Sequence, residues 1–402
     1  MSNETKSNMA LPSNAHVFGS DVIRVGLVGC GGRGTGAASN AVEAAEGVEI
    51  YAMGDLFKDR LDSSRENLKG LGARFNVTDD RCFVGFDAYK KVIASDVHYV
   101  LFATPPGFRP IQARAAIEAG KHIFVEKPVA VCPTGIRHFI ETSKMASAKG
   151  LGVLAGTQYR HDPRFVETIK RIHDGAIGDI LAGQIYYLTG ELWHHGRKPD
   201  WTDAEFQIRN WLYFNWLAGD HIIEQHVHNI DVMCWVMNGH PEKALAMGGR
   251  QKRVDPKYGH IYDHFTTLYD YPNNVKWVSM CRQMDNTQSR VTDHVVGTKG
   301  TSCPWGWIRG ETNWRFQGPH NMYVQEHADF IASLRAGKPL NEGVQVAEST
   351  LTGIMGRMSA YTGQEVTWEQ AMNSQLNLMR DVNAFGPIDS EPIAIPGKTA
   401  LV

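Results

Sequence analysis

The chain has 402 residues, of which 43% are hydrophobic and 21% are charged, so it is long enough for two domains with substantial apolar cores. Its formal net charge of −2 comes without a basic stripe or an acidic tail, which argues against nucleic acid as the main partner. No apolar run of the sequence reaches the length of a membrane span, so no membrane association is expected.

The first 20 residues are polar and predict a mobile arm. They contain neither the hydrophobic stretch of a signal peptide nor a twin arginine, so the sequence as written predicts a cytoplasmic protein. A periplasmic location follows instead if an export signal has been removed. The six cysteines form no CxxC pair, which indicates reduced thiols rather than a zinc site or a disulfide framework.

A glycine-rich signature follows the first predicted strand, residues 22–28, and fills the pattern G-x-G-x-x-G. A turn without Cβ atoms lets a pyrophosphate approach the backbone N–H groups and the positive end of the following helix. The pattern predicts dinucleotide binding, and the alternative is a glycine-rich turn of some other α/β fold. The predicted cofactor-binding residues of this turn are Gly29, Gly31, Gly32, Arg33 and Gly34.

A second predicted strand, residues 48–54, ends at Asp55, whose carboxylate can accept hydrogen bonds from both ribose hydroxyls of a dinucleotide. The same charge would repel the 2′-phosphate of NADP, so NAD is the predicted cofactor. Lys58 and Arg60 follow closely and could bind that phosphate, which keeps NADP or dual use as the alternative. Otherwise these two side chains lie on a solvated helix face.

Short apolar runs alternate with amphipathic stretches over the first 150 residues, the βαβ pattern of a doubly wound parallel sheet. The strand at 98–103 leads into a turn in which Thr104 and Pro105 are predicted to meet the nicotinamide half of the cofactor. The strand at 122–125 delivers Glu126-Lys127-Pro128 to the carboxyl edge of the sheet, where ligands bind in open α/β folds. Because the proline stiffens this turn, Glu126 and Lys127 are predicted to be held against the cofactor.

From about residue 180 the pattern changes to strand-like runs without alternating long helices, which predicts a large, mostly antiparallel open sheet. The predicted strands are residues 181–188, 244–250, 265–271, 275–281 and 294–297, and the predicted helices are 220–237 and 324–335. The predicted organisation is an α/β protein with a Rossmann domain at 21–160, an α/β substrate-binding and oligomerisation domain at 161–372, and a C-terminal extension at 373–402.

Together these motifs resemble the Gfo/Idh/MocA oxidoreductases, over residues 22–372. The residues that carry the resemblance are the glycine turn at 29–34, Asp55, Thr104-Pro105-Pro106, Glu126-Lys127-Pro128, Glu224 to Asp231, and Gly297-Thr298-Lys299-Gly300. The resemblance implies a homo-dimer or homo-tetramer that transfers a hydride between NAD and a hydroxyl of a sugar, polyol or glycoside. It also admits an NAD-dependent glycosidase that oxidises the sugar C3 transiently, with no net redox change. A non-catalytic, NAD-sensing protein is a further alternative.

The predicted catalytic group consists of Lys127, Glu224 and His228. The family usually has Asp four residues before the histidine, whereas Glu224 here keeps the charge and extends its reach. On one helix the two side chains would share a face, so the carboxylate would orient the imidazole and favour its protonated form. We predict His228 as general base, Glu224 as its orienting carboxylate and Lys127 as the ammonium that positions the oxygen. Exchanged roles for Lys127 and His228, or a purely structural polar helix, are the alternatives.

Aromatic side chains beside polar donors suit a carbohydrate substrate. The predicted substrate-binding residues are Arg160, Trp193, His194, His195, Asn210 and Trp211. For the tryptophans the alternative is a core or interface role. Although His221 and His226 crowd around His228, the chain has neither an HExxH motif nor a cysteine pair, so no metal site is predicted.

Overall fold

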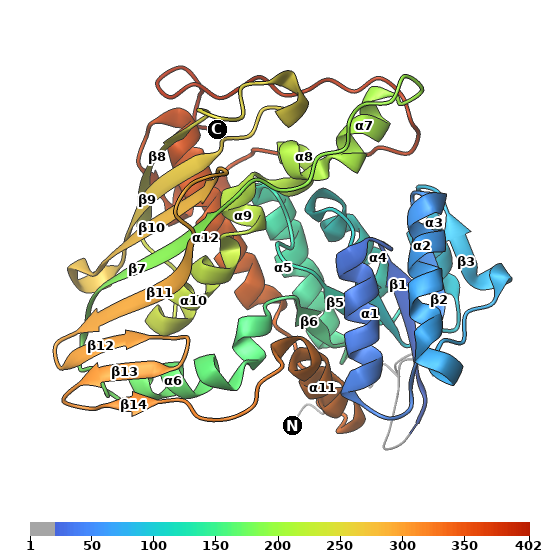
Figure 1. Cartoon of the computed structure of the whole chain (residues 1–402), viewed down its shortest axis with the longest axis horizontal. Helices are drawn as coiled ribbons and strands as arrows, with labels where there is room; N and C mark the ends of the chain where they lie inside the picture. The colour runs from blue at the N-terminus through green and yellow to red at the C-terminus, as the bar shows by residue number, and fades with distance from the viewer. Residues whose placement is uncertain (1–20) are drawn as a thin grey trace, which may run out of the picture.

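The computed structural model describes residues 21–402, and the predicted mobile arm at 1–20 lies outside this range. Within it, Figure 1 shows two sheets side by side, each covered by helices. The first sheet has six parallel strands in the order β3-β2-β1-β4-β5-β6. This order reverses direction between β1 and β4, and such a switch point opens a crevice at the carboxyl ends of the strands. The predicted α/β class and doubly wound sheet are confirmed.

The elements of the first half follow the predicted alternation of strands and helices. In chain order they are β1 (Ile23–Val28), α1 (Gly32–Ala44), β2 (Val48–Asp55), α2 (Lys58–Leu68), β3 (Cys82–Val84), α3 (Ala88–Ala94), β4 (Tyr99–Phe102), α4 (Arg109–Glu118), β5 (His122–Val125), α5 (Pro133–Ala148) and β6 (Val153–Ala155). All residues of β4 and β5 are buried, as expected for central parallel strands with helices on both faces.

The second half carries a nine-stranded sheet within residues 21–402, in the order β14-β13-β12-β11-β7-β10-β9-β8-β15. Its pairs are antiparallel except for β7 with β10, so the predicted mostly antiparallel sheet is confirmed. Its strands are β7 (Ile180–Thr189), β8 (Lys243–Gly249), β9 (His264–Asp270), β10 (Lys276–Gln283), β11 (Arg290–Gly297), β12 (Gly300–Cys303), β13 (Trp307–Gly310), β14 (Trp314–Arg315) and β15 (Val366–Thr367). Its helices are α6 (Pro163–His173), α7 (Asp203–Arg209), α8 (Asn215–Ala218), α9 (His221–Glu224), α10 (Val227–Met237), α11 (Met322–Arg335), α12 (Gly343–Thr362) and α13 (Trp368–Asn373).

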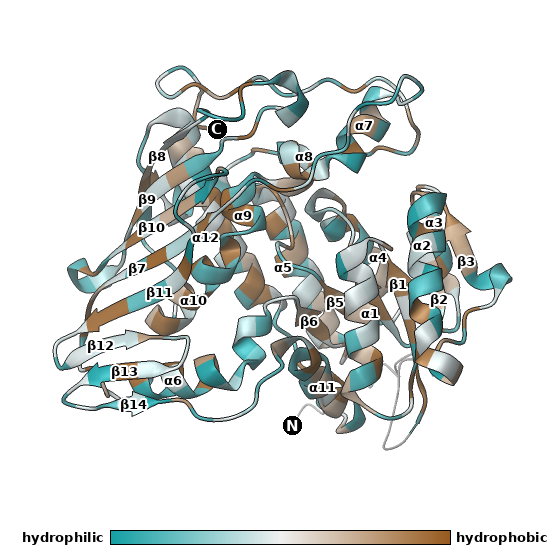
Figure 2. Ribbon diagram, in the orientation of Figure 1, coloured by the Kyte–Doolittle hydropathy of each residue, from teal (hydrophilic) through white to brown (hydrophobic). Residues whose placement is uncertain are grey.

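Apolar residues concentrate where the helices meet the sheets. Figure 2 shows them on the central helices α9 and α10, whereas α2 is polar along most of its length. Among the described residues, no helix is both long enough and apolar enough to cross a bilayer.

The predicted continuous helix over residues 220–237 is wrong, because the chain breaks it into α9 and α10. At the break, the N–H of His226 bonds to the carbonyl of His221, five residues earlier, instead of continuing the regular i−4 ladder. At the same position, the Gln225 side chain accepts a hydrogen bond from the Gln283 side chain of β10 at 2.7 Å. Tertiary contacts therefore override the local helical pattern here.

Helix α11 connects the two halves, because it leaves the second sheet and packs on the first. Its residues Phe330, Ile331 and Leu334 share one core with Val25 and Leu27 of β1. The segment 161–372, predicted as one domain, thus contributes a helix to the core of the Rossmann half. The long helix α12 packs against both α5 and the strand β8.

The buried side chain of His161 reinforces the connection between the two halves. Its ring atoms Nδ1 and Nε2 contact Asp329 at 2.7 Å and Glu342 at 3.1 Å, respectively, so His161 links three segments of the chain. Burial alone would lower the pKa of His161, but these two carboxylates raise it to about 10. The protonated imidazole therefore stabilises the fold.

Substitution of His161 by glutamine is expected to lower the free energy of unfolding by about 2 kcal/mol, since it breaks a buried ion pair whose partner Asp329 is partly screened by solvent. The folded-state pKa lies above the ordinary value of 6.5, so this stabilisation is complete below pH 6.5 and is lost as the pH rises towards 10. Urea denaturation of both proteins across this range measures the difference. A destabilisation that stays constant with pH would contradict a charged His161.

Candidate active site

The glycine turn between β1 and α1 is shaped by close backbone approaches. Gly29 has φ +93, and a Cβ there would lie 2.7 Å from the backbone of Thr104. A Cβ at Gly34 would lie 1.9 Å from the carbonyl oxygen of Gly29, so this glycine lets the helix pack on the turn. A Cβ at Gly31 or Gly32, in contrast, would meet nothing within 4 Å. Two glycines therefore form the turn, and two leave space beside it.

A cavity of about 660 Å³ opens next to this turn, a volume in the range of cofactor sites. It runs along the carboxyl edge of the first sheet at the switch point, where a dinucleotide is expected. The predicted cofactor-binding residues that line it are Gly29, Gly31, Gly32, Arg33, Gly34, Asp55, Thr104 and Pro105, whereas Glu126 and Lys127 are not among its lining residues. The start of α1 also lies at this wall and can receive a pyrophosphate. The residues present therefore fit a nicotinamide dinucleotide.

Asp55 stands at the end of β2, on the wall of this cavity. Its Oδ2 accepts a hydrogen bond from the N–H of Cys30 at 2.6 Å, and its Oδ1 accepts one from Phe57 at 2.8 Å. Burial raises the pKa of Asp55, although these two N–H donors and the nearby Arg60 offset part of the effect. The two backbone bonds fix the carboxylate in a position where it can accept ribose hydroxyls.

Lys127 reaches across from the first half to the second. Its Nζ donates to the Glu224 carboxylate at 3.1 Å and also to the backbone carbonyl of the same residue. Both side chains are largely buried, with exposed fractions of 12% and 13%. Lys127 is therefore fixed at the interface between the Rossmann turn and α9.

Arg109 holds the turn that carries Lys127. Its guanidinium donates to the carbonyl oxygens of Glu126 at 2.9 Å and Pro128 at 2.6 Å, and also to that of Thr104 at 2.8 Å. One buried arginine thus ties together the two predicted loops of the nicotinamide end. The sequence did not single out this residue.

Arg33 connects the glycine turn to two buried carboxylates. Its guanidinium forms ion pairs with Glu126 and, at 3.1 Å, with Glu326 of α11. Burial raises the pKa of Glu326 to about 8, against the opposing effect of Arg33. Arg33 and Glu126, both predicted to touch the cofactor, therefore contact each other.

His228 lies at the start of α10, with its ring 5.2 Å from that of Tyr159. Its Nδ1 is buried and has no hydrogen-bond partner among residues 21–402. Desolvation, followed by the positive charges of Lys127 and Arg33, holds the pKa of His228 well below its ordinary value. The expectation that Glu224 would favour a protonated imidazole is therefore wrong. The helix breaks between the two residues, and the Glu224 carboxylate binds Lys127 instead.

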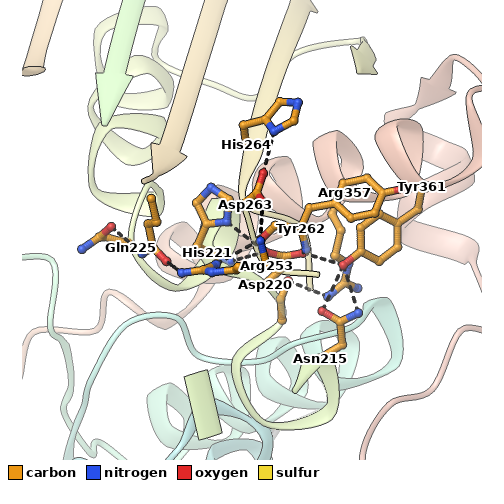
Figure 3. A network of polar contacts seen from close by, with 12 residues as sticks. Asn215, Asp220, His221, Gln225, Arg253, Tyr262, Asp263, His264, Arg357 and Tyr361 are labelled. Carbon is orange, nitrogen blue, oxygen red and sulfur yellow. Dashed lines mark hydrogen bonds and ion pairs between the residues drawn. The ribbon is translucent and has the colours of Figure 1, made fainter. Parts of the chain in front are cut away.

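A network of buried polar groups supports α9, and Figure 3 shows it around Asp220. One oxygen of Asp220 accepts hydrogen bonds from the backbone and the ring of His221, and the other accepts them from the N–H of Tyr262 and the hydroxyl of Tyr361. Burial alone would raise the pKa of Asp220, but the bonds from His221 and Tyr361 lower it. This network fixes the beginning of α9, and the Gln225 contact fixes its end, so Glu224 is positioned from both sides.

The histidines near His228 have other partners. His221 pairs with Asp220 at 3.0 Å, and His226 contacts the hydroxyl of Ser279 at 2.8 Å. Among the described residues, no three His, Cys, Asp or Glu side chains gather as metal ligands.

Three of the predicted substrate residues lie in the dinucleotide cavity. Trp193, His195 and Trp211 line its wall beside Arg60, and the Arg60 guanidinium contacts His195 at 3.1 Å. The rings of Trp193 and Trp211 meet at 6.2 Å. These residues share the wall of the cavity with Asp55 and the glycine turn, and their role as substrate-binding residues stays a prediction.

The other three predicted substrate residues are held by protein partners. Arg160 forms a two-point ion pair with Asp231, at 2.8 and 3.0 Å. Asn210 is fully buried and bonds both the N–H and the carbonyl of His195, which fixes that residue's backbone. His194 contacts the carbonyl of Lys257 at 2.9 Å. Each of these side chains therefore positions a neighbouring segment.

Comparison with known proteins identifies the family. The family model described as "Oxidoreductase family, NAD-binding Rossmann fold" matches residues 23–154, and the GFO/IDH/MocA C-terminal domain model matches residues 165–302. Inositol 2-dehydrogenase 4 of Saccharopolyspora erythraea is 31% identical over 159 residues, which are 40% of this chain and 43% of that protein. A glycosyl hydrolase family 109 protein of Shewanella pealeana is 28% identical over 176 residues, 43% of this chain and 37% of that protein.

These alignments span less than half the length of either relative. Among solved structures, scyllo-inositol dehydrogenase from Lactobacillus casei with bound NAD(H) and scyllo-inositol has a TM-score of 0.66 at 18% identity. The superposition covers 86% of this chain and 99% of that one, so the fold is shared over nearly the whole of that enzyme. With both domain models matched in order, the chain belongs to the Gfo/Idh/MocA oxidoreductase family.

Proposed function

We propose that the protein is an NAD-dependent dehydrogenase that moves a hydride between the nicotinamide and a hydroxyl-bearing carbon of a sugar, polyol or glycoside. The observation that carries this proposal is the position of Lys127, which follows a strand at the carboxyl edge of the Rossmann sheet and is bonded across to Glu224. The neutral imidazole of His228 lies close enough to Lys127 for the ammonium charge to lower the histidine pKa. Hydroxyl oxidation needs such a donor and base beside the dinucleotide site.

The glycine turn, Asp55 and the Thr104 loop would hold the dinucleotide, which supplies the hydride acceptor. We favour NAD over NADP because the fixed Asp55 carboxylate would repel a 2′-phosphate, whereas Arg60 is engaged with His195. The Lys127 ammonium positions the substrate oxygen, and His228 accepts its proton. Glu224 keeps the ammonium in place, which is a different role from the one its spacing to His228 suggested.

The pH profile of the reaction tests the role of His228. Because its pKa is held below the ordinary value of 6.5, the imidazole is neutral and ready to accept a proton at neutral pH. The acid limb of kcat/KM is therefore expected below pH 6.5, and His228→Asn is expected to lower kcat by about 10²–10⁴-fold. Steady-state rates across the acid range measure both effects. An acid limb above pH 6.5 would contradict a neutral His228.

A redox-neutral glycosidase is the second candidate, favoured by the match to the glycosyl hydrolase family 109 relatives. In that reaction the C3 carbon would give its hydride to bound NAD and its hydroxyl proton to a base, C2 would lose a proton, and the aglycone would depart with the bonding electrons and take up a proton. Water would then add to the resulting double bond, and the same hydride would return to C3 with a proton to its oxygen. Lys127 and His228 would serve the same oxidation step in both reactions.

One panel of substrates separates the two candidates. Inositols, free sugars and aryl glycosides are mixed with the enzyme and NAD, while the absorbance of NADH and the release of the aryl group are followed together. Lasting formation of NADH, up to at least the amount of bound NAD, supports the dehydrogenase, whereas aryl release without lasting NADH supports the glycosidase. If neither signal arises although NAD binds, the chain is a non-catalytic NAD-binding protein.

We also propose that the protein forms a homo-oligomer through the outer face of the second sheet. On this face Met247 and Leu245 of β8 are 74% and 49% exposed, and Met280 of β10 is 36% exposed. Thr266 pairs with both methionines, so these side chains lie in one row across three strands. An exposed apolar row of this kind marks an association surface.

The six cysteines are free thiols, which supports the proposed cytoplasmic location.

A further inference from the structure

The C-terminal segment, residues 374–402, is a strap that follows the last helix and reaches the cofactor cavity. Figure 1 shows it in red, crossing over α8 and α7. Four consecutive residues of the strap line the dinucleotide cavity, namely Arg380, Asp381, Val382 and Asn383. They complete a wall whose other parts come from the Rossmann half and from the segment around Trp211.

Phe385 anchors the strap to the Rossmann half. Its ring stacks on Phe57 with centroids 5.7 Å apart and an interplanar angle of 15°. The same ring meets Phe86 at 5.0 Å and 61°. Phe57 and Phe86 both line the cavity, next to Asp55, so the anchor lies at the end where the adenosine of a dinucleotide is expected. Because Phe385 is still 41% exposed, it is not part of a core.

The strap is hydrogen-bonded to α7, so the strap and this helix cover the cavity together. The N–H of Ala204 donates to the carbonyl of Gly386 at 3.0 Å, and the Gln207 side chain donates to that of Ile388 at 3.2 Å. Helix α7 is in turn tied to the Rossmann half, because Arg209 bonds Asp59 at 3.1 and 3.2 Å and its guanidinium lies 3.8 Å from the ring centre of Phe57. Phe57 is therefore flanked by Phe385 and Arg209.

We propose that the strap completes the adenosine end of the NAD site and makes NAD a resident group that stays bound between turnovers. This inference rests on the proposed function. Residues 380–383 add contacts to the bound adenosine, and the seat of Phe385 on Phe57 and Phe86 keeps those contacts in place. Dissociation of the cofactor then requires the strap to leave this seat.

Substitution of Phe385 by alanine tests the strap. We expect NAD to remain with the wild-type protein through desalting, and we expect Phe385→Ala to release it about tenfold faster, because two aromatic contacts are lost. The matched control is Ile393→Ala, which removes another exposed strap side chain, 52% exposed. Phe385→Tyr preserves the ring and is expected to restore retention. The measurement is the dissociation rate of NADH, followed by the loss of energy transfer from protein tryptophans during a chase with excess NAD.

Three outcomes are distinguishable. Faster release from Phe385→Ala alone supports the strap. Equal release from wild type, Phe385→Ala and Ile393→Ala, with NADH bound in all three, overturns the strap inference and leaves the proposed function standing. If wild-type protein binds no NADH at any concentration, both are overturned. Thermal unfolding without cofactor, expected to be the same for all variants, shows that each is folded.

Discussion

Replacing Lys127 with methionine is expected to lower kcat by about 10²–10⁴-fold while the protein still binds NAD. Methionine keeps most of the volume of the side chain but removes the ammonium that Glu224 holds at the interface of the two halves. Without this charge, the oxygen of the substrate loses the donor that positions it and that stabilises developing negative charge. Steady-state rates and NADH binding, measured on the same preparation, give both quantities.

Lys58→Met provides the matched control, because Lys58 is 74% exposed on α2 and its ion pair, among the described residues, is with its helical neighbour Asp62. Its kcat is expected to equal that of the wild type. Glu224→Gln should lie between the two variants, since the backbone carbonyl of the same residue still accepts from Lys127. Near-normal turnover of Lys127→Met would show that the chemistry takes place elsewhere.

Substitution of Gly31 by alanine is expected to weaken NAD binding by at least about tenfold without unfolding the protein. The backbone at Gly31 has φ −72, which alanine adopts readily, and its Cβ would meet no protein atom within 4 Å. That free space belongs to the cavity wall where the pyrophosphate is expected, so the methyl group would collide with the cofactor alone. Titration of protein fluorescence with NADH measures the loss of affinity.

Gly36→Ala is the control for this substitution, because Gly36 also has open space around its Cβ but lies in α1, away from the cavity lining. This second variant should bind NADH normally and be slightly more stable, since alanine is favoured over glycine within a helix by up to about 1 kcal/mol. Equal NADH affinity of the two variants would mean that no pyrophosphate lies against Gly31.

The Rossmann half was predictable because its signals are local. The run His122–Val125 is wholly apolar apart from its first residue, and β5 begins and ends where the pattern predicts. The glycines at 29, 31 and 34 predict a turn, and the structure shows close backbone approaches at Gly29 and Gly34. Such features depend on a residue's own conformational range and on its immediate neighbours, so one sequence suffices to find them.

The arrangement around His228 depends on contacts that are distant in sequence. The helical pattern of residues 220–237 gives no sign of the Gln225 bond to Gln283, 58 residues away. This contact lies at the break that separates Glu224 from His228. The Glu224 carboxylate accepts a hydrogen bond from Lys127 instead. The supporting role of Asp220 could not be predicted from the sequence either. Its unusual backbone, with φ +75 directly after Gly219, is seen only in the structure.

The location of the tryptophans was also beyond local reasoning. Aromatic residues beside polar donors suit either a sugar or an adenosine, and only the fold places Trp193 and Trp211 in the dinucleotide cavity. The strap residues around Phe385 form no recognisable motif. Their role could not be predicted because it depends on packing against Phe57 and Phe86, about 300 residues earlier in the chain.

A single-turnover measurement shows whether hydride transfer takes place at Lys127 and His228. Enzyme loaded with NAD is mixed rapidly with each member of the substrate panel, and the absorbance of NADH is followed. This step is common to the dehydrogenase and to the redox-neutral reaction, so wild-type enzyme should show NADH formation, lasting or transient, with at least one polyol, sugar or glycoside. Lys127→Met, loaded equally with NAD, should show none on the same time scale. NADH formation at the wild-type rate in Lys127→Met, or its absence from loaded wild-type enzyme with every substrate, would contradict the account.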